Sequence, residues 1–192
     1  MTAITINFNP IIKLTADQFY QLCQANPDIK FERNVQGEII IMPPTGGTTG
    51  NRNFKLAQQL ANWTDTDGTG IGFDSSTCFQ LPNGSNRSPD AAWISLQKWN
   101  ALTPEQQEKF PPICPDFVVE LRSASDALKP LQEKMQEYIE NGTRLGWLIN
   151  GQNRQVEIYR QGREKEVLDN PATLFGEDIL PGFRLNLSIV WG

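Results

Sequence analysis

A short hydrophobic segment that runs directly into two charges constrains this chain more than any other feature. In PDFVVELRSASD, residues 115–126, the apolar residues 117–119 lead into Glu120 and Arg122. A continuous apolar run bounded by turn residues is typical of a strand in the middle of a sheet that is covered on both faces. Glu120 and Arg122 are two residues apart, so both side chains would project from one face, about 6.6 Å apart along the strand. Charges at the end of a buried strand need partners, and the rest of the chain must supply them.

Helical spacing of apolar residues predicts two longer helices, over residues 51–65 and 126–142. A shorter helix is expected after Thr15, which would cap it, and Ser125-Asp126 would cap the second long helix. The segment TGGTTG, residues 45–50, is expected to be a loop. It is not a P-loop, because no Gly-Lys-Ser/Thr follows it.

Strand patterns alternate with these helices. In chain order, strands are predicted in FERN, in GEIIIMPP, on both sides of the turn Pro82-Asn83-Gly84, and in FVVELR, RLGWLIN, QVEIYR and LNLSIVW. This order predicts an α/β fold with a mixed central β-sheet flanked by α-helices. A length of 192 residues is most simply a single domain, residues 1–192.

The composition excludes several catalytic devices. The chain has no histidine, which removes the commonest general base, the Ser-His-Asp and Cys-His arrangements and any histidine-containing zinc site. Its three cysteines are far apart with no CxxC pair, so neither a zinc knuckle nor a disulfide framework is indicated. Any metal would be held by oxygen ligands, which favours Mg²⁺, Mn²⁺ or Ca²⁺.

The overall charge argues against indiscriminate binding to nucleic acid. A formal charge of −5 is the opposite of the usual basic footprint, although a local patch or a metal ion can still recruit phosphates. The chain shows neither a basic segment followed by a long apolar run at its start nor an apolar stretch long enough to span a bilayer. We therefore expect a cytoplasmic protein without a membrane partner.

Strand geometry decides which carboxylates can meet. Asp116 and Glu120 would lie four residues apart on one strand, about 13 Å, which is too far to share one ion. Asp90 stands where the strand after Pro82-Asn83-Gly84 begins, and a neighbouring strand could bring it within about 5 Å of Glu120. These two carboxylates and a backbone carbonyl next to Glu120 could hold a divalent ion that activates a hydrolytic water at a phosphodiester.

A cation beside such an ion would orient the attacking water or stabilise developing charge. Arg122 can only stabilise charge, because arginine does not deprotonate in proteins. Lys134, on the helix that follows and at the border of its apolar face, could supply the ammonium group that the strand lacks.

Three segments in this order and spacing, SPDAAWIS, PDFVVELRSASD and KMQEYIENGTRLGWLIN, resemble the Uma-type restriction endonuclease family of the PD-(D/E)xK nuclease superfamily. GEIIIMPPT resembles the opening strand of that family, so the likeness extends from about Phe31 to Tyr159. The resemblance implies a restriction-endonuclease-like core and cleavage of DNA that depends on Mg²⁺, with Mn²⁺ as an alternative. It also implies, by analogy with the family, a homodimer.

Carried over residue by residue, the resemblance makes Asp90 and Glu120 metal ligands and Lys134 the lysine of the motif. Arg122 occupies the strand position that this lysine holds in other nucleases, and Glu38 matches an acidic residue that supports metal or water. The chain departs from the family pattern at Ala124, where proline is usual, and in having arginine at position 122.

Other interpretations remain open at this level. Glu120 could form a structural ion pair with Arg122, Asp90 could be a turn residue, and Lys134 and Glu38 could be solvated surface groups. The arginine at position 122 leaves open a catalytically inactive nuclease fold that binds DNA or protein. A third possibility is a metal-dependent phosphohydrolase that acts on small molecules.

Overall fold

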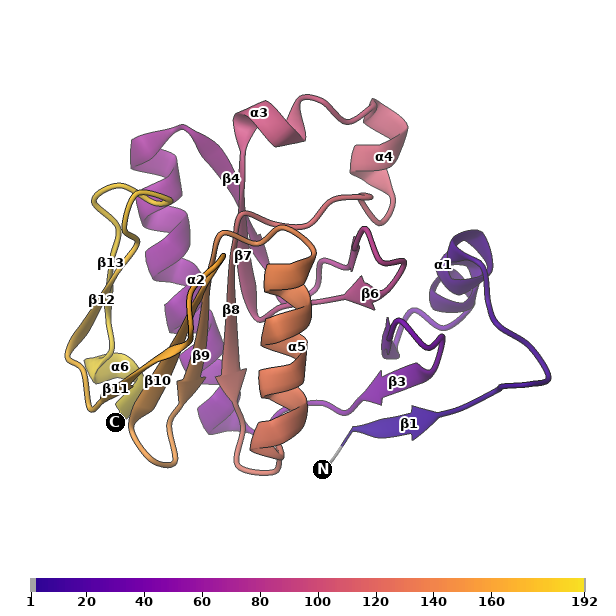
Figure 1. Cartoon of the computed structure of the whole chain (residues 1–192), viewed down its shortest axis with the longest axis horizontal. Coiled ribbons are helices and arrows are strands. Elements are labelled where there is room, and N and C mark those ends of the chain that lie inside the picture. The colour runs from indigo at the N-terminus through magenta and orange to yellow at the C-terminus, as the bar shows by residue number, and fades with distance from the viewer. Residues whose placement is uncertain (1–2, 192) are drawn as a thin grey trace.

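The computed structural model describes residues 3–191 and contains a large sheet, a smaller sheet beside it and a short hairpin (Figure 1). The large sheet has six strands in the order β11 (Glu166–Asp169), β10 (Gln155–Arg160), β9 (Leu145–Asn150), β8 (Phe117–Arg122), β7 (Ala91–Ser95) and β4 (Gly70–Asp74). The smaller sheet has five strands in the order β1 (Ile4–Ile6), β3 (Ile39–Met42), β2 (Lys30–Arg33), β6 (Asn86–Arg87) and β5 (Phe79–Gln80). The hairpin pairs β12 (Thr173–Phe175) with β13 (Arg184–Asn186).

The helices are distributed around these sheets as α1 (Ala16–Ala25), α2 (Gly47–Asp67), α3 (Leu96–Trp99), α4 (Pro104–Glu108), α5 (Leu128–Glu140) and α6 (Ser188–Trp191). The two long helices, α2 and α5, lie on opposite faces of the large sheet, and α1 lies beside the smaller sheet (Figure 1). Within the described residues, no helix combines the length and the apolar character needed to cross a membrane.

β8 is a central strand, as its apolar run predicts. It pairs in parallel with β9 and antiparallel with β7, so the large sheet is mixed. Side chains of a strand alternate between the two faces of a sheet. Val119 accordingly lies in one buried cluster with Leu56 and Leu60 of α2, and Val118 lies in a second with Met135 of α5. Burial on both faces explains why this segment reads as continuously apolar.

The turn Pro82-Asn83-Gly84 forms a hairpin as predicted, but the hairpin belongs to the smaller sheet. β5 and β6 flank this turn and pair with each other, and β6 also pairs with β2. β4 and β7, which come before and after the hairpin in the chain, pair directly in the large sheet. The chain therefore leaves the large sheet, contributes a hairpin to the smaller one and returns just before β7. This path fixes the smaller sheet next to the start of β7.

Two predictions about helix starts were wrong. TGGTTG is not a loop, because α2 begins at Gly47 with Gly46 in the cap position. Once the apolar residues between 54 and 63 have packed as a helix, each residue added at its start gains a backbone hydrogen bond at little entropic cost. This gain outweighs the poor helix propensity of Gly and Thr. α5 is not capped by Ser125-Asp126: it begins at Leu128 without a side-chain cap. The Asp126 carboxylate instead accepts a hydrogen bond from the Ser123 amide, 2.9 Å away, and closes the preceding loop.

The predicted last strand, LNLSIVW, is only partly a strand. β13 ends at Asn186, and residues 188–191 form the helical turn α6. The Asn186 carboxamide oxygen accepts a hydrogen bond from the Ser188 amide, 2.9 Å away, which favours a helical start over a continued strand. Leu187 and Val190 are buried in the cluster on the α2 side of the large sheet. The helical turn therefore buries the apolar residues of this segment that a continued strand was expected to bury.

Gly70→Ala should destabilise the large sheet, because a Cβ at Gly70 would overlap the Trp93 ring and lie 2.5 Å from the Ile94 carbonyl oxygen. Overpacking of this kind typically costs about 1–3 kcal/mol of unfolding free energy. Gly47→Ala is the matched control, because nothing lies within 4 Å of a Cβ there. Urea unfolding of both variants measures the difference. Equal effects of the two substitutions would contradict this packing.

Candidate active site

A groove of about 1820 Å³ lies between the smaller sheet and the large sheet with α5. Its walls come from β2 and β3, the start of α2, the loop after β8 and one side of α5. Several charged side chains line it although they are nearly inaccessible to solvent, among them Glu32, Glu120 and Lys134. Buried charges that face a groove are uncommon without a functional or structural reason, so their partners define the candidate site.

Asp90 is positioned by the last turn before β7. Ala91 lies opposite Val119 in the antiparallel pair of β7 and β8. Asp90, which precedes Ala91, is therefore next to Glu120 and Leu121 near the end of β8. The Asp90 Oδ2 atom accepts a hydrogen bond from the Leu121 amide at 2.7 Å, and Oδ1 accepts one from the Asn53 carboxamide at 2.9 Å. Burial raises the pKa of Asp90 above its usual value, although these hydrogen bonds act in the opposite direction. The carboxylate is thus held rigidly at the groove wall.

Glu120 is 5% exposed and points toward α5. Its Oε1 atom lies 2.7 Å from Lys134 Nζ and accepts a hydrogen bond from the Tyr138 hydroxyl at 3.1 Å. Burial raises the pKa of Glu120 to about 7, and the charges of Asp90 and Glu32 add to this effect while Lys134 opposes it. The protein therefore compensates the negative charge of ionised Glu120 only in part.

Lys134 projects from α5 between two carboxylates. Its Nζ atom is 2.8 Å from Glu32 Oε1 and 2.7 Å from Glu120 Oε1. Burial alone would lower the pKa of this ammonium group, but the two carboxylates outweigh that effect and raise the pKa above its usual value. Lys134 is therefore a permanent cation in this arrangement.

No local sequence pattern points to Glu32, which the structure places next to Lys134. Glu32 lies on β2 and is 2% exposed. Although burial alone would raise the pKa of Glu32, Lys134 and Arg87 lower it to about 2. The local pattern predicts a strand at FERN, but Glu32 and Lys134 are 102 residues apart in the chain. Only the docking of the smaller sheet onto α5 brings them together.

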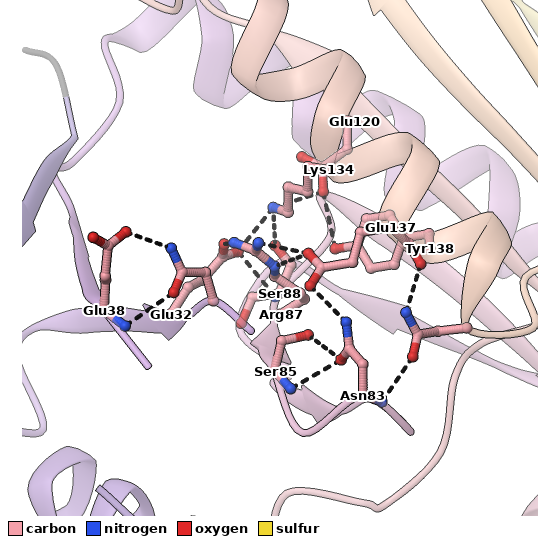
Figure 2. A network of polar contacts seen from close by, with 12 residues as sticks. Glu32, Glu38, Asn83, Ser85, Arg87, Ser88, Glu120, Lys134, Glu137 and Tyr138 are labelled. Carbon is pink, nitrogen blue, oxygen red and sulfur yellow. Dashed lines mark hydrogen bonds and ion pairs between the residues drawn. The ribbon is translucent and has the colours of Figure 1, made fainter. Parts of the chain in front are cut away.

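The structure does not bring Arg122 and Glu38 into this cluster. Arg122 donates hydrogen bonds to the Asp126 carbonyl oxygen at 3.0 Å and to the Asn150 side chain at 3.4 Å, so it ties down the loop after β8. Glu38 lines the groove, but its carboxylate accepts a hydrogen bond from the Asn34 carboxamide at 2.7 Å and lies apart from Lys134 (Figure 2).

Asp116, the other aspartate that follows a proline, has a structural role. One carboxylate oxygen is 2.9 Å from Lys98 Nζ, and the other accepts a hydrogen bond from the Ser95 amide at 3.0 Å. These contacts hold the start of β8 against the end of β7, far along the strand from Glu120. The separation along the strand matches the argument that Asp116 and Glu120 cannot share one ion.

The charge balance of the cluster fits a divalent cation. Four carboxylates, those of Glu32, Asp90, Glu120 and Glu137, are grouped with two directly paired cations, Arg87 and Lys134, while Lys30 acts on Asp90 from further away. Full ionisation thus leaves an excess of two negative charges, and burial makes this excess costly. Asp90 and Glu120 carry the unbalanced charge and are hard oxygen donors, the kind that Mg²⁺ prefers. No group of three acidic or cysteine side chains in residues 3–191 is arranged to hold a metal ion, so an ion between Asp90 and Glu120 would also need water or substrate oxygens.

A family model matches residues 16–188, which is most of the chain, and carries the description "Putative restriction endonuclease" under the name Uma2. The chain belongs to the Uma2 family. The resemblance seen in the motif segments is thereby confirmed, and the matched region includes every residue of the cluster. No curated protein matches the chain.

Solved structures agree with the Uma2 assignment at the level of the fold. The chain is similar to "a putative nuclease belonging to DUF820 from Anabaena variabilis ATCC 29413", with a TM-score of 0.77 and 20% sequence identity over 93% of this chain and 97% of that one. Another similar structure, the DrdV-DNA complex, has a TM-score of 0.35 and 12% identity over 64% of this chain and 12% of that one. The first similarity supports the nuclease-like α/β fold, and the second is too low to support an argument.

Glu120→Gln should stabilise the metal-free protein at alkaline pH. Because the folded-state pKa of about 7 lies above the ordinary value of 4.5, stability falls as pH rises between these values and stays lower above them. Glutamine avoids this loss, since it carries no charge. We expect the melting temperature of the variant in EDTA to exceed that of the wild type by a few degrees at about pH 8.5, and by less at about pH 5.5. A difference that does not change with pH would contradict the charge excess.

Proposed function

We propose that this chain is a metal-dependent endonuclease that hydrolyses phosphodiester bonds in DNA, with Mg²⁺ as its ion and Mn²⁺ able to replace it. One observation carries the proposal. Asp90, just before β7, and Glu120, on the neighbouring strand β8, both line the groove with an excess of negative charge, and the ammonium group of Lys134 lies 2.7 Å from Glu120. Membership of the Uma2 family supports the same reaction class.

Asp90 and Glu120 would hold the ion. When bound, it would supply an activated water and neutralise charge on the phosphate. Asn53 and the Leu121 amide fix the Asp90 carboxylate, so one metal ligand is held by hydrogen bonds in advance. Tyr138 does the same for Glu120 from the opposite side.

Lys134 has an electrostatic role in this proposal. Its raised pKa keeps the ammonium group charged at neutral pH, so it donates hydrogen bonds to a water or a phosphate oxygen and does not accept a proton. Arg122 is directed into the loop after β8, so we assign it to the support of that loop. Glu38 lies at the groove edge, where it could reach substrate or water but not the cluster.

The groove is unusually acidic for a surface that receives DNA. Ten acidic residues and three basic residues line it. A phosphate backbone would be repelled from such a surface without bound cations, so contacts with DNA should be few and metal-dependent. We further propose that the chain acts as a single domain over residues 1–192, in the cytoplasm and as a homodimer that addresses two strands.

Purified protein should nick supercoiled plasmid in the presence of Mg²⁺ or Mn²⁺. Asp90→Asn and Glu120→Gln should each reduce the rate at least about a hundredfold, because each removes a charged metal ligand. Glu133→Gln is the matched control on α5, since Glu133 lines the groove but pairs with the exposed Lys129, at 3.8 Å, and not with Lys134. Agarose electrophoresis of time courses measures the nicking.

Two outcomes would count against this function. Wild-type protein that is folded but does not nick in either metal contradicts the endonuclease proposal. If Mg²⁺ still raises its melting temperature and both ligand variants abolish that shift, the chain is an inactive nuclease fold that binds metal and DNA or protein. Nicking that survives in both ligand variants would instead place the chemistry outside this cluster.

A further inference from the structure

Lys134 is held from the smaller sheet by one buried carboxylate, Glu32 (Figure 2). The Oε1 atom of Glu32 lies 2.8 Å from Lys134 Nζ and accepts a hydrogen bond from the Ser88 amide at 3.0 Å. The Oε2 atom accepts a hydrogen bond from Arg87 Nη1 at 3.2 Å. All three partners are donors, so both oxygens of Glu32 act as acceptors.

Arg87 connects this carboxylate back to α5. Its Nε atom donates to Glu137 Oε2 at 2.6 Å, and its Nη2 atom is 2.5 Å from the same oxygen. Glu137 follows Lys134 by three residues, so both project from the same side of α5. The other oxygen of Glu137 accepts a hydrogen bond from the Asn83 carboxamide at 2.9 Å. The network in Figure 2 therefore closes a ring between α5, β2, β6 and the turn at Asn83.

The ring restricts where the lysine ammonium can go. A lysine side chain has four methylene groups and rotates freely unless its end is fixed. Without Glu32, the ammonium would keep only a long hydrogen bond to the Ser88 carbonyl oxygen at 3.4 Å on that side. It could then move further over Glu120 and toward Asp90, onto the carboxylates proposed to bind metal. With Glu32 in place, two carboxylates from different sheets hold it at about equal distances, 2.8 and 2.7 Å.

We propose that Glu32 is a positioning residue that fixes Lys134 for phosphodiester hydrolysis, and that Arg87 and Glu137 fix Glu32 in turn. The smaller sheet thus completes the active site through a carboxylate that touches neither substrate nor metal. This inference rests on the proposed function for its catalytic consequence, while its structural part concerns Lys134 alone.

Conservative substitutions separate charge from geometry. Glu32→Gln keeps the size of the side chain, but an amide has one acceptor oxygen and its NH₂ group would face a donor in either orientation. Arg87→Lys keeps the charge, but a single ammonium group cannot bridge Glu32 and Glu137 as the planar guanidinium does. Glu157→Gln is the matched control, because Glu157 is also a buried carboxylate with several donors, namely Gln132, Tyr159 and Lys165.

Nicking kinetics should distinguish positioning from a general loss of stability. We expect Glu32→Gln to lower kcat at least about tenfold with KM changed by less than about threefold, because the lysine acts in the transition state. Arg87→Lys should lower kcat less, and Glu157→Gln should leave kcat unchanged even if its melting temperature falls as far. The increase in melting temperature on adding Mg²⁺ should persist in Glu32→Gln. Equal loss of kcat in Glu32→Gln and Glu157→Gln would overturn the proposal.

A second measurement does not depend on nuclease activity. In protein labelled with ¹⁵N and ¹³C at lysine, the buried and doubly paired Lys134 ammonium should give a resolved NMR signal, which Lys134→Arg identifies by its loss. Glu32→Gln should broaden or abolish this signal, and Glu157→Gln should leave it in place. An unchanged signal in Glu32→Gln would overturn the positioning role. If the signal disappears as expected but the wild type does not nick DNA, the proposed function fails and the positioning of Lys134 stands.

Discussion

The interaction on which the rest of the site depends is the sharing of one buried ammonium group between two carboxylates. Lys134 contacts Glu32 on the smaller sheet and Glu120 on the large sheet at nearly equal distances. Either buried carboxylate would be costly without a cation, and the lysine would be costly without them. The contact therefore ties α5 and both sheets into one unit and fixes the width of the groove between them.

The same contact divides the carboxylates into two groups. Glu32 pairs with Lys134 and Arg87 and accepts a hydrogen bond from a backbone amide. Its pKa falls to about 2, so its charge is fully compensated. Glu120 shares the lysine but stands near Asp90, and its pKa rises to about 7. The unbalanced negative charge thus gathers at Asp90 and Glu120, where a divalent ion from solution can enter. The fold thus compensates one buried charge completely and leaves the adjacent pair, Asp90 and Glu120, without a full counter-charge from the protein.

Local sequence patterns could predict the central strands of the large sheet and most residues of the candidate site, but not the edge strand β11. The apolar run before Glu120 predicts a central strand, and helical spacing predicts the face that bears Lys134. A Pro-Asp pair at the start of the preceding apolar strand, β7, predicts the position of Asp90. Glu32 could not be predicted, because its partners are supplied by a second sheet whose docking leaves no local pattern. Arg122 could not be placed either: it stands beyond the β7–β8 pairing and is free to turn to Asp126 and Asn150.

Anomalous diffraction from crystals soaked in Mn²⁺ would show whether Asp90 and Glu120 form a metal site, because it locates the ion without requiring turnover. We expect one strong anomalous peak in contact with both Asp90 and Glu120, with Lys134 still paired to Glu32, and no peak at that position in crystals of Asp90→Asn. A peak elsewhere in the groove, or no peak between these two carboxylates at saturating Mn²⁺, would contradict this expectation.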